Sequence, residues 1–460
     1  MENEELKATE KEFLQRMHKT AVEHNRIAPE LYEKYNVKRG LRNADGSGVL
    51  VGLTEIGDVH GYVVSEHETK PVAGELRYRG IEIKDLVSGF QKEKRHGFEE
   101  TAFLLLFGKL PTKEELKSFT DILASKRTLP LGFKENMILK NPSRDLMNQL
   151  ARSVLILYSF DEQAEDRALP TVIRQCIDLI ARFPTIIAYS YQAKQHYHGD
   201  KSLHLHQPVE ALSTAESFLH LIRPDSQYTK LEADLLDIAL VLHAEHGGGN
   251  NSTFATHLVA SSDTDTYSAI AAAVGSLKGR KHGGANIEVI EMMSDIKKHV
   301  KDWTSEKQVA AYIKKIINKN AFDRTGLVYG MGHAVYTISD PREEILREHA
   351  KKLAKEKGRS EEFELYRLVQ TLTPMLFAEI KKSKKSIACN VDFYSGFVYS
   401  MLGIPGDLFT PIFAISRISG WAAHLIEEHV SGGRIMRPAY KYVGGSKQFI
   451  PMSKRIPVEA

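Results

Sequence analysis

The spacing of apolar positions changes twice along the chain. Residues 4–35 are mostly polar with sparse apolar positions, which predicts a surface helix or an arm that contacts a partner subunit. Residues 43–87 contain short β-like pieces, such as 49–54 and 62–64, divided by Gly, Asp and His; we expect small peripheral strands there. After Asp85, apolar residues recur at three- and four-residue spacing almost to the end, which predicts one helix after another.

Local signals indicate where several of these helices begin and end. The apolar run 101–107 stops at Gly108, and Thr112 is placed to cap the next helix. Asp340 is placed to cap a later helix, with Pro341 at its first position. Together the elements predict an all-α protein with a multi-layer core and minor strands near the N-terminus. Further helices are expected at 143–158, 169–192, 208–221, 230–242, 306–319, 361–382 and 412–430.

Composition limits the class of protein. The 460 residues carry 62 Lys plus Arg and 59 Asp plus Glu, a formal charge of +3, so no basic field predicts binding to nucleic acid. A small anionic ligand stays possible. Two cysteines and 42% hydrophobic residues predict a reduced, cytoplasmic globular protein. An acidic N-terminus argues against a secretory signal, and no stretch reaches the roughly 20 apolar residues of a membrane span, so no membrane contact is expected.

His282 lies in a glycine-rich break, residues 277–286, between two apolar helix-like segments. The partial positive charge at the start of the following helix disfavours a protonated imidazole, which predicts a neutral hydrogen-bond donor. A solvated loop histidine beside a helix cap is the competing interpretation. A phosphate-binding P-loop is excluded because the break lacks its spacing and its Lys-Ser/Thr pair.

Two groups of histidines suggest a metal site. Two His-x-His pairs lie within residues 196–206, in a polar connector without a Cys or Glu to complete a ligand set. His243 and His246 form His-x-x-His ahead of three glycines, but the glutamate beside the first histidine and the third ligand of a zincin are missing. Glycines there allow a close approach of backbone to a ligand. We therefore expect no metal.

The C-terminal half carries further candidate groups. His333 ends the tight loop 330–333, and Asp392 lies among apolar residues that should raise its pKa and make it a better base, although helix capping is a rival role. Arg342 in a first helical turn indicates a nearby anion or else a solvated side chain. Arg417 on an apolar helix should be buried and paired with a carboxylate. Arg437 lies on an extended arm of the kind that often crosses to a partner subunit.

Taken in order, several motifs resemble those of the citrate synthase family, whose members condense an acyl-CoA with a 2-oxo acid. Only about the first forty residues fall outside the resemblance. It implies a helical homodimer with a large domain, residues 1–281 and 386–460, and a small domain, residues 282–385, that closes on the substrates. It implies no cofactor, since acetyl-CoA is a substrate. The motifs lie at residues 74–80, 104–112, 246–250, 282–286, 330–333, 340–342 and 390–392.

The resemblance also implies a role for each matching residue. Asp392 would take a proton from the methyl group of acetyl-CoA while His282 donates a hydrogen bond to the thioester oxygen. His333 would polarise the ketone of oxaloacetate and protonate the alkoxide, and hydrolysis of citryl-CoA would follow. The carboxylates of oxaloacetate would be held by a set of four residues, the last from the other subunit: His246, Arg342, Arg417 and Arg437.

The contacts to CoA depart from the family pattern. Thr337 and Ala334 stand where family members often carry basic residues, so these positions are not expected to bind CoA phosphates. The predicted CoA contacts are Gly330, Met331, Gly332, Asn390, Lys384 and Lys385.

Other functions remain open. 2-Methylcitrate synthase would use propionyl-CoA with the same residues, and one methylene in an apolar pocket is worth only about 1–3 kcal/mol. A zinc hydrolase and a non-catalytic helical scaffold are remote alternatives; the first predicts loss of activity with a chelator, the second predicts missing catalytic groups.

Overall fold

The computed structural model describes residues 2–43, 47–65, 68–382 and 386–455. These residues contain 17 α-helices and one small 3-stranded sheet, which confirms the predicted all-α class. They divide into two compact units. The first comprises Met1–Leu53 with Arg437–Ala460, and the second comprises Thr54–Met436, in each case as far as the chain is described.

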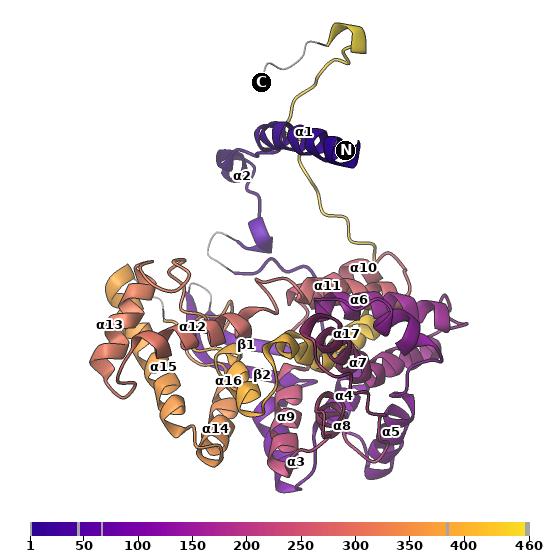
Figure 1. Cartoon of the computed structure of the whole chain (residues 1–460), viewed down its shortest axis with the longest axis vertical. Helices are drawn as coiled ribbons and strands as arrows, with labels where there is room; N and C mark the ends of the chain where they lie inside the picture. The colour runs from indigo at the N-terminus through magenta and orange to yellow at the C-terminus, as the bar shows by residue number, and fades with distance from the viewer. Residues whose placement is uncertain (1, 44–46, 66–67, 383–385, 456–460) are drawn as a thin grey trace. The chain divides into compact units, whose positions relative to one another are not determined.

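The first unit contains α1 (Glu2–His24) and α2 (Pro29–Lys34), labelled in Figure 1. The predicted polar helix at 4–35 is therefore present in two pieces, with Pro29 at the first position of the second. Single 3₁₀ turns follow at Arg39–Leu41 and Met452–Lys454. The expected strand at 49–54 does not form. Leu50 and Leu53 are 83% and 88% exposed, and apolar alternation without a neighbouring strand does not make a sheet.

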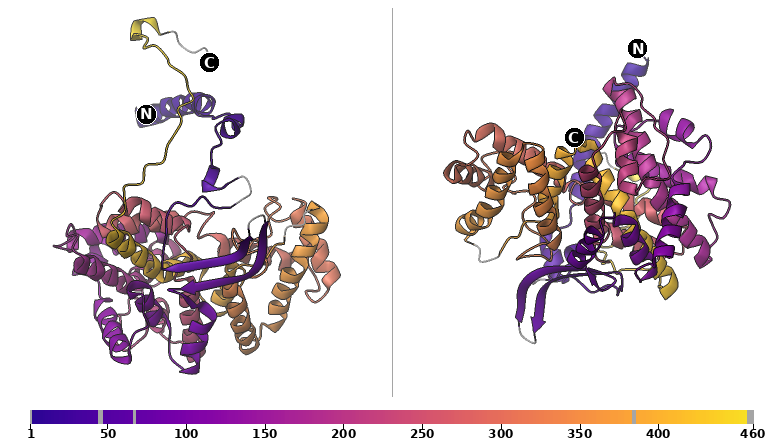
Figure 2. Two further views of the ribbon diagram at one scale, coloured as in Figure 1. Left: turned by 180° about the vertical axis from the view of Figure 1, so that it is seen from behind. Right: turned by 90° about the horizontal axis from the view of Figure 1, so that it is seen from below.

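The second unit begins with an antiparallel sheet of β1 (Gly57–Ser65), β2 (Glu68–Tyr78) and β3 (Ile81–Glu82) in that order. Gly57 pairs with Tyr78, and the register shifts between His60 and Tyr62. Figure 2 shows the β1–β2 hairpin to one side of the helices, which confirms the peripheral strands.

Gly74 brings this hairpin against the segment that follows His333. Its N–H donates to Ser339 Oγ at 3.3 Å. A Cβ at Gly74 would overlap Ser339 O and the Tyr336 ring. The strand can therefore pass close to residues 336–339 only because position 74 has no side chain.

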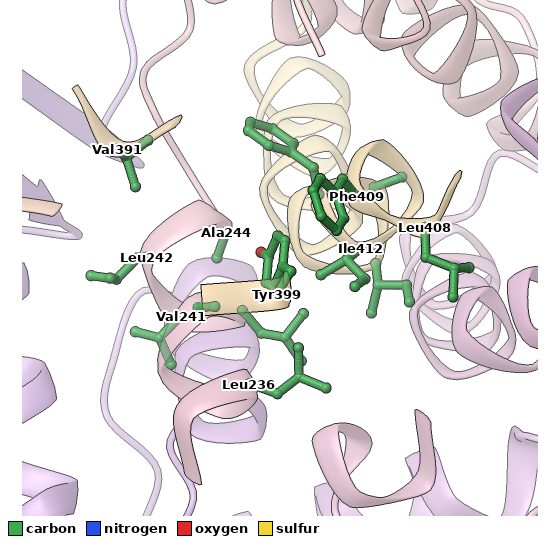
Figure 3. Packing of buried hydrophobic residues seen from close by; sticks show 14 of the residues in the cluster. Leu236, Val241, Leu242, Ala244, Val391, Tyr399, Leu408, Phe409 and Ile412 are labelled. Atoms are coloured by element: carbon green, nitrogen blue, oxygen red, sulfur yellow. The ribbon is translucent and has the colours of Figure 1, made fainter. Parts of the chain in front are cut away.

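Helix α17 (Phe409–Ser431) is the centre of the helical core. It packs against α4, α6, α7, α9, α10, α11 and α12, and every residue from Phe409 to Ile426 is buried. Figure 3 shows Phe409 and Ile412 packed near Tyr399 and the end of α9. The surrounding helices are α3 (Ile83–Lys92), α4 (Phe98–Phe107), α5 (Lys113–Lys126), the π-helical turn Lys134–Leu139, α6 (Leu146–Leu157), α7 (Leu169–Gly199), α8 (Thr214–Ile222), α9 (Lys230–His243), α10 (Asn251–Ala260) and α11 (Thr266–Leu277).

A second group of helices packs mainly on itself: α13 lies on α15, α14 on α15 and α16, and α12 on α16. Contacts of α14 and α16 with α9 and of α12 with α17 join this group to the core. The predicted domain boundaries at 282 and 385 remain a prediction. The group consists of α12 (Ala285–His299), α13 (Glu306–Ile317), α14 (Pro341–Glu356), α15 (Ser360–Lys381) and α16 (Val391–Met401).

The helix ends predicted from capping signals match the structure, whereas the helix expected at 208–221 begins at Thr214 and the one expected at 169–192 continues to Gly199. Thr112 and Glu115 form a capping box at the start of α5. Asp340 caps α14 by accepting a hydrogen bond from Arg342 N–H. Gly108 ends α4 in the left-handed conformation, φ 73°. Among the described helices, none combines the length and apolarity needed to cross a bilayer.

Candidate active site

Six side chains predicted from the sequence come together in the second unit. His246 follows α9, His282 precedes α12, and His333 lies in the segment between α13 and α14. The His246 and His333 ring centroids are 5.0 Å apart. Asp392, in the first turn of α16, and His282 both lie within electrostatic reach of Arg417, and Asp392 within reach of Arg342 as well. Residues more than 170 positions apart in the chain thus form one site.

Arg417 is completely buried on α17, as predicted. Its Nε donates to His243 O at 2.7 Å, and its guanidinium carbon lies 4.7 Å from the centre of the Phe413 ring. The two terminal nitrogens have no hydrogen-bond partner among the described residues. Burial lowers the pKa of Arg417 to about 10, so the group stays charged near neutral pH. Two parallel, buried N–H donors match a carboxylate.

Arg342 is also buried, so it is not a solvated side chain, and the alternative prediction of a nearby anion applies. Its Nε and one terminal nitrogen donate to both carboxylate oxygens of Asp340, at 3.0 and 2.7 Å. Although burial lowers the pKa of Arg342, the Asp340 carboxylate raises it overall. The anion beside Arg342 is therefore the carboxylate of the cap residue Asp340, which fixes the orientation of the Arg342 guanidinium.

His333 has a defined orientation. Its Nδ1 accepts hydrogen bonds from the N–H groups of Val335 and Tyr336, both at 3.1 Å. The ring stacks on Tyr336 at 4.7 Å between centroids. In the neutral tautomer the proton must then reside on Nε2, which makes His333 a hydrogen-bond donor at that atom.

The loop that carries His333 is joined to the loop that precedes Asp392. Gly332 N–H donates to Ala388 O, and Asn390 N–H donates to Gly330 O, at 2.7 and 2.9 Å. The Asn390 side chain donates to Gly332 O at 2.8 Å and accepts from Asp392 N–H at 3.0 Å. These bonds hold the two loops, and with them His333 and Asp392, in register.

As a whole residue Asp392 is partly exposed to solvent. Its carboxylate is nevertheless surrounded by protein and poorly hydrated. Burial raises the pKa of Asp392 to about 6, although Arg342 and Arg417 lower it. The capping residue Asn390 accepts a hydrogen bond from the backbone N–H of Asp392 and makes no bond to the Asp392 carboxylate. The apolar setting predicted from the sequence thus raises the pKa as expected.

His282 is neutral, as predicted, but burial is the main cause. Burial lowers its pKa to about 4, and Arg417 contributes, whereas the sequence pattern indicates only the effect of the helix start. His282 Nε2 lies 3.0 Å from Ser252 Oγ. That oxygen already accepts from Trp421 Nε1–H, so the single Ser252 proton can go to His282 Nε2 or to Asn250 Oδ1. When it goes to His282, the imidazole proton is placed on Nδ1.

His243 and His246 lie beside the two arginines. Burial, Arg342 and then neighbouring charges lower both pKa values well below the usual range, so both imidazoles are neutral. Neither nitrogen of His243 nor Nε2 of His246 has a partner among the described residues. Gly247, with φ 81°, permits the turn that follows. Two positive arginines so close are more suited to an anionic ligand than to a metal cation.

A cavity of about 260 Å³ opens beside His333. Met331 and Gly332, both predicted CoA contacts, line it, whereas Gly330 and Asn390 join the two loops. Thr337 Oγ1 is buried there without a partner in the described chain. The other lining residues are Gly326, Leu327, Val328, His333, Tyr336, Thr373, Phe377, Ser386 and Ile387.

The structure does not test three of the predicted residues. Lys384 and Lys385 lie outside the described residues. Arg437 belongs to the other unit and is exposed in the single chain. Their roles remain predictions.

Sequence reasoning did not single out Ser252 or Tyr336, which contact His282 and His333. Ser252 lies two residues after the 246–250 motif, but only the fold brings it to His282, thirty positions away.

Comparison with known proteins identifies this arrangement. A model of the family described as "Citrate synthase, C-terminal domain" matches residues 44–439. The chain belongs to the citrate synthase family. As a member of this family it is an acyltransferase. The citrate synthase of Synechocystis sp. is 35% identical over 388 residues, 83% of this chain and 89% of that protein. The 2-methylcitrate synthase of Shewanella oneidensis is 33% identical over 392 residues, 83% and 92% of the two chains.

Solved structures of citrate synthases share the fold. The Pyrobaculum aerophilum enzyme superposes with a TM-score of 0.73 at 30% identity, covering 89% of this chain and 94% of that one. The Thermoplasma acidophilum enzyme, solved as a ternary complex with carboxymethyl coenzyme A and oxaloacetate, gives a TM-score of 0.72 at 27% identity and covers 91% and 99%.

Proposed function

We propose that this protein condenses acetyl-CoA with oxaloacetate and hydrolyses citryl-CoA to citrate and CoA. The observation that carries the proposal is the completely buried Arg417 guanidinium, whose two terminal nitrogens lack a partner in the described chain. A buried guanidinium is costly unless an anion pairs with it. Oxaloacetate supplies two carboxylates, and the Thermoplasma acidophilum relative was solved with that compound.

Oxaloacetate would bind between Arg417, Arg342 and His246. Arg342 keeps its direction through Asp340, and the neutral imidazole of His246 adds a donor without adding charge. His333, with its proton on Nε2, would donate to the ketone oxygen and protonate it as negative charge develops. Arg437 of a second subunit would complete the set in a homodimer.

Acetyl-CoA would be activated between Asp392 and His282. The methyl group of a thioester is a weak acid, so its proton leaves only if the enolate oxygen is stabilised at the same time. Asp392, with its pKa raised to about 6, is ionised at neutral pH and a stronger base than an ordinary carboxylate. His282 donates from Nδ1 when Ser252 donates to its Nε2. The enolate carbon then attacks the ketone carbon of oxaloacetate.

We further propose that the reaction takes place in the cytoplasm and uses no cofactor. The acyl-CoA itself supplies the activated carbon, and the groups described above supply the base and the donors. A closing movement of the predicted small domain would keep water away until the thioester is to be hydrolysed.

The overall reaction is tested by thiol release with each acyl-CoA in turn. The purified chain should release CoA rapidly from acetyl-CoA and oxaloacetate, and kcat/KM should be lower with propionyl-CoA. A preference for propionyl-CoA would instead assign the protein as a 2-methylcitrate synthase. Absence of thiol release with both would support the non-catalytic scaffold. A chelator that abolished the activity would favour the zinc hydrolase.

The role of Asp392 is tested by Asp392→Ala. This variant should lose condensation while still binding oxaloacetate, as measured by calorimetry, because the arginines remain. Retained turnover would remove Asp392 from the role of base.

A further inference from the structure

Behind the proposed active site, helices α10 and α17 bring a second group of titratable side chains together: His257, His424 and Glu427. His257 Nε2 lies 3.1 Å from His424 Nδ1, and His424 Nδ1 lies 3.6 Å from Glu427 Oε2. One ligand atom from each residue falls within 4.8 Å of the other two. The proposed condensation uses none of these three groups.

We propose that His257 Nε2, His424 Nδ1 and Glu427 Oε2 bind a divalent transition-metal ion of the zinc class. Zinc–nitrogen and zinc–oxygen distances of about 2.0–2.2 Å place neighbouring tetrahedral ligands roughly 3.3–3.5 Å apart. The separations of 3.1 and 3.6 Å lie on either side of that spacing. Two imidazoles with one carboxylate suit zinc, cobalt or nickel, whereas magnesium and calcium prefer oxygen ligands alone.

The partners of the two histidines support this assignment. His257 Nδ1 is 2.8 Å from Glu428 Oε2, and His424 Nε2 is 3.1 Å from Glu245 Oε1. Each imidazole therefore has a carboxylate at one nitrogen and turns the other nitrogen towards the site. Histidines that bind metals are usually oriented in this way.

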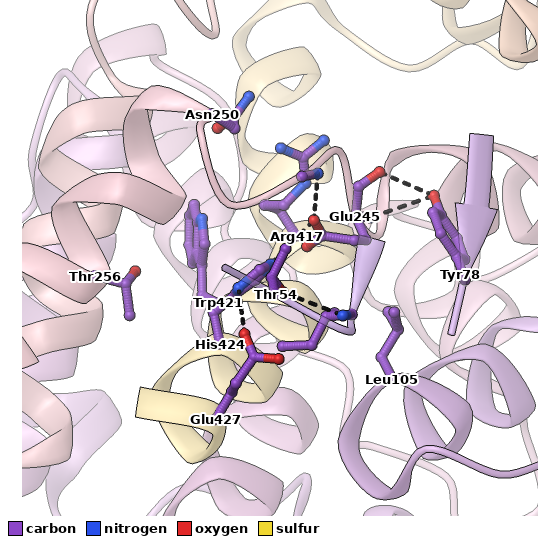
Figure 4. Close-up of polar contacts among 12 residues, drawn as sticks. Thr54, Tyr78, Leu105, Glu245, Asn250, Thr256, Arg417, Trp421, His424 and Glu427 are labelled. Carbon is purple, nitrogen blue, oxygen red and sulfur yellow. Dashed lines mark hydrogen bonds and ion pairs between the residues drawn. The ribbon is translucent and has the colours of Figure 1, made fainter. Parts of the chain in front are cut away.

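The carboxylate ligand is also held in place. Glu427 Oε1 accepts a hydrogen bond from Glu55 N–H at 2.8 Å, so Oε2 is the oxygen that faces the site. The 3.6 Å between Oε2 and His424 Nδ1 is longer than a hydrogen bond. Figure 4 shows Glu427 one turn along α17 from His424, with Glu245 on the far side of the imidazole. The Glu427 and Glu428 side chains are 16% and 15% exposed, whereas His424 is fully buried, so the ion would enter from the Glu427 side.

A metal here would strengthen the structure and take no part in the chemistry. It would link α10 to α17 and to the backbone at residue 55. Its most direct link to the proposed oxaloacetate site would be Glu245, which contacts His424 and precedes His246. Condensation should therefore survive removal of the metal, while resistance to heat should fall.

The test uses the full, untagged chain after treatment with a chelator and dialysis. Titration with Co²⁺ should give one ion per chain with the strong visible absorption of a four- or five-coordinate site, and Zn²⁺ should displace it. Zn²⁺ should also raise the melting temperature, whereas Mg²⁺ should not.

Variants locate the ion. His257→Gln and Glu427→Gln should each weaken Zn²⁺ binding at least tenfold, and Glu428→Gln, which removes only the carboxylate that orients His257, roughly tenfold. His429→Gln on the same helix is the matched control and should bind as the parent does.

Two outcomes would overturn the proposal. One is a Co²⁺ spectrum of six-coordinate type in the unaltered chain, a result that does not depend on any variant folding. The other is undiminished Zn²⁺ affinity in both His257→Gln and Glu428→Gln, which would assign the binding to surface histidines.

Discussion

At the scale of single residues, the site combines buried positive charge with neutral imidazoles. Arg417 and Arg342 are both buried, and burial, followed by the charges of these arginines, lowers the pKa values of His243 and His246 well below the usual range. Neutral imidazoles can donate without repelling the guanidinium groups. The same field lowers the pKa of Asp392, but burial outweighs it. The groups proposed to bind the anion and those proposed to move protons thus influence each other electrostatically.

Arg417→Lys should raise the KM for oxaloacetate on the order of 100-fold, because an ammonium group cannot make two parallel bonds to a carboxylate. The KM for acetyl-CoA should change much less. Arg127→Lys is the control, because Arg127 is also buried but its guanidinium donates to Val209 O and Leu212 O. In this variant the stability of the fold should fall, while the KM for oxaloacetate should remain unchanged. A KM unchanged in Arg417→Lys would contradict the proposed pairing.

The activity should depend on pH through Asp392. Its pKa is raised to about 6, and the base must be ionised to accept a proton. Below pH 6 we therefore expect kcat/KM for acetyl-CoA to fall roughly tenfold per pH unit, and above it to level off. Steady-state rates between pH 5 and 8 measure this, with circular dichroism as a check on folding. A profile that stays flat down to pH 5 would rule out this base.

The same shift makes Asp392 a cost to stability at neutral pH. Its pKa is higher folded than unfolded, so the folded state favours the protonated form, and stability is lost as pH rises through 6. Asp392→Asn should remove up to about 3 kcal/mol of this cost and raise the melting temperature by a few degrees at pH 8 but not at pH 4. A lower melting temperature at pH 8 would be the opposite of the expected result.

At the scale of elements, the two joined loops before α14 and α16 decide where His333 and Asp392 lie. Gly330 has φ 76°, and a Cβ there would lie 2.7 Å from Phe393 and 2.9 Å from Val289. Such a position tolerates no side chain without movement of α16, the helix that carries Asp392. Local backbone geometry and catalytic geometry are therefore linked at this loop.

Gly330→Ala should reduce kcat at least tenfold and destabilise the fold by about 2–4 kcal/mol. Gly403→Ala is matched to it, since Gly403 also has a positive φ, 69°, but a Cβ would meet nothing within 4 Å in the described chain. That control should cost only about 1 kcal/mol and leave kcat unchanged. Equal effects of the two changes on kcat would show that close packing at Gly330 is unimportant.

At the scale of the whole molecule, we propose that a second copy of the chain completes the site with Arg437. Arg437 lies in the unit formed by the two ends of the chain, whereas the other proposed site residues lie in the second unit. Arg437 is exposed in the single chain. A shared site would explain why the arm carries it.

Mixing two inactive variants tests this arrangement. Asp392→Ala and Arg437→Ala should each be nearly inactive as pure proteins. After denaturation and refolding together, half of the dimers would be mixed, and each mixed dimer would contain one site with both residues intact. About a quarter of the parental activity should then return. No recovery beyond the sum of the two variants would place Arg437 within its own subunit.

The sequence by itself determined the helical class and the local chemistry. Thr112, Asp340 and Gly108 act within a few residues of themselves, so their roles could be predicted without a fold. The same holds for the apolar neighbours of Asp392 and the burial of Arg417, because an apolar helix face must be covered. The order of the motifs also sufficed to predict the citrate synthase family.

Only the tertiary structure decided which groups meet. The burial that neutralises His282 and the contact of His282 with Ser252 depend on side-chain positions that spacing does not specify. The strand expected at 49–54 failed for the same reason, because strands need partners and the pattern contains no information about them. The cluster of His257, His424 and Glu427 joins residues 167 positions apart. Non-local contacts form when buried surfaces pack together, and that packing is a property of the whole chain.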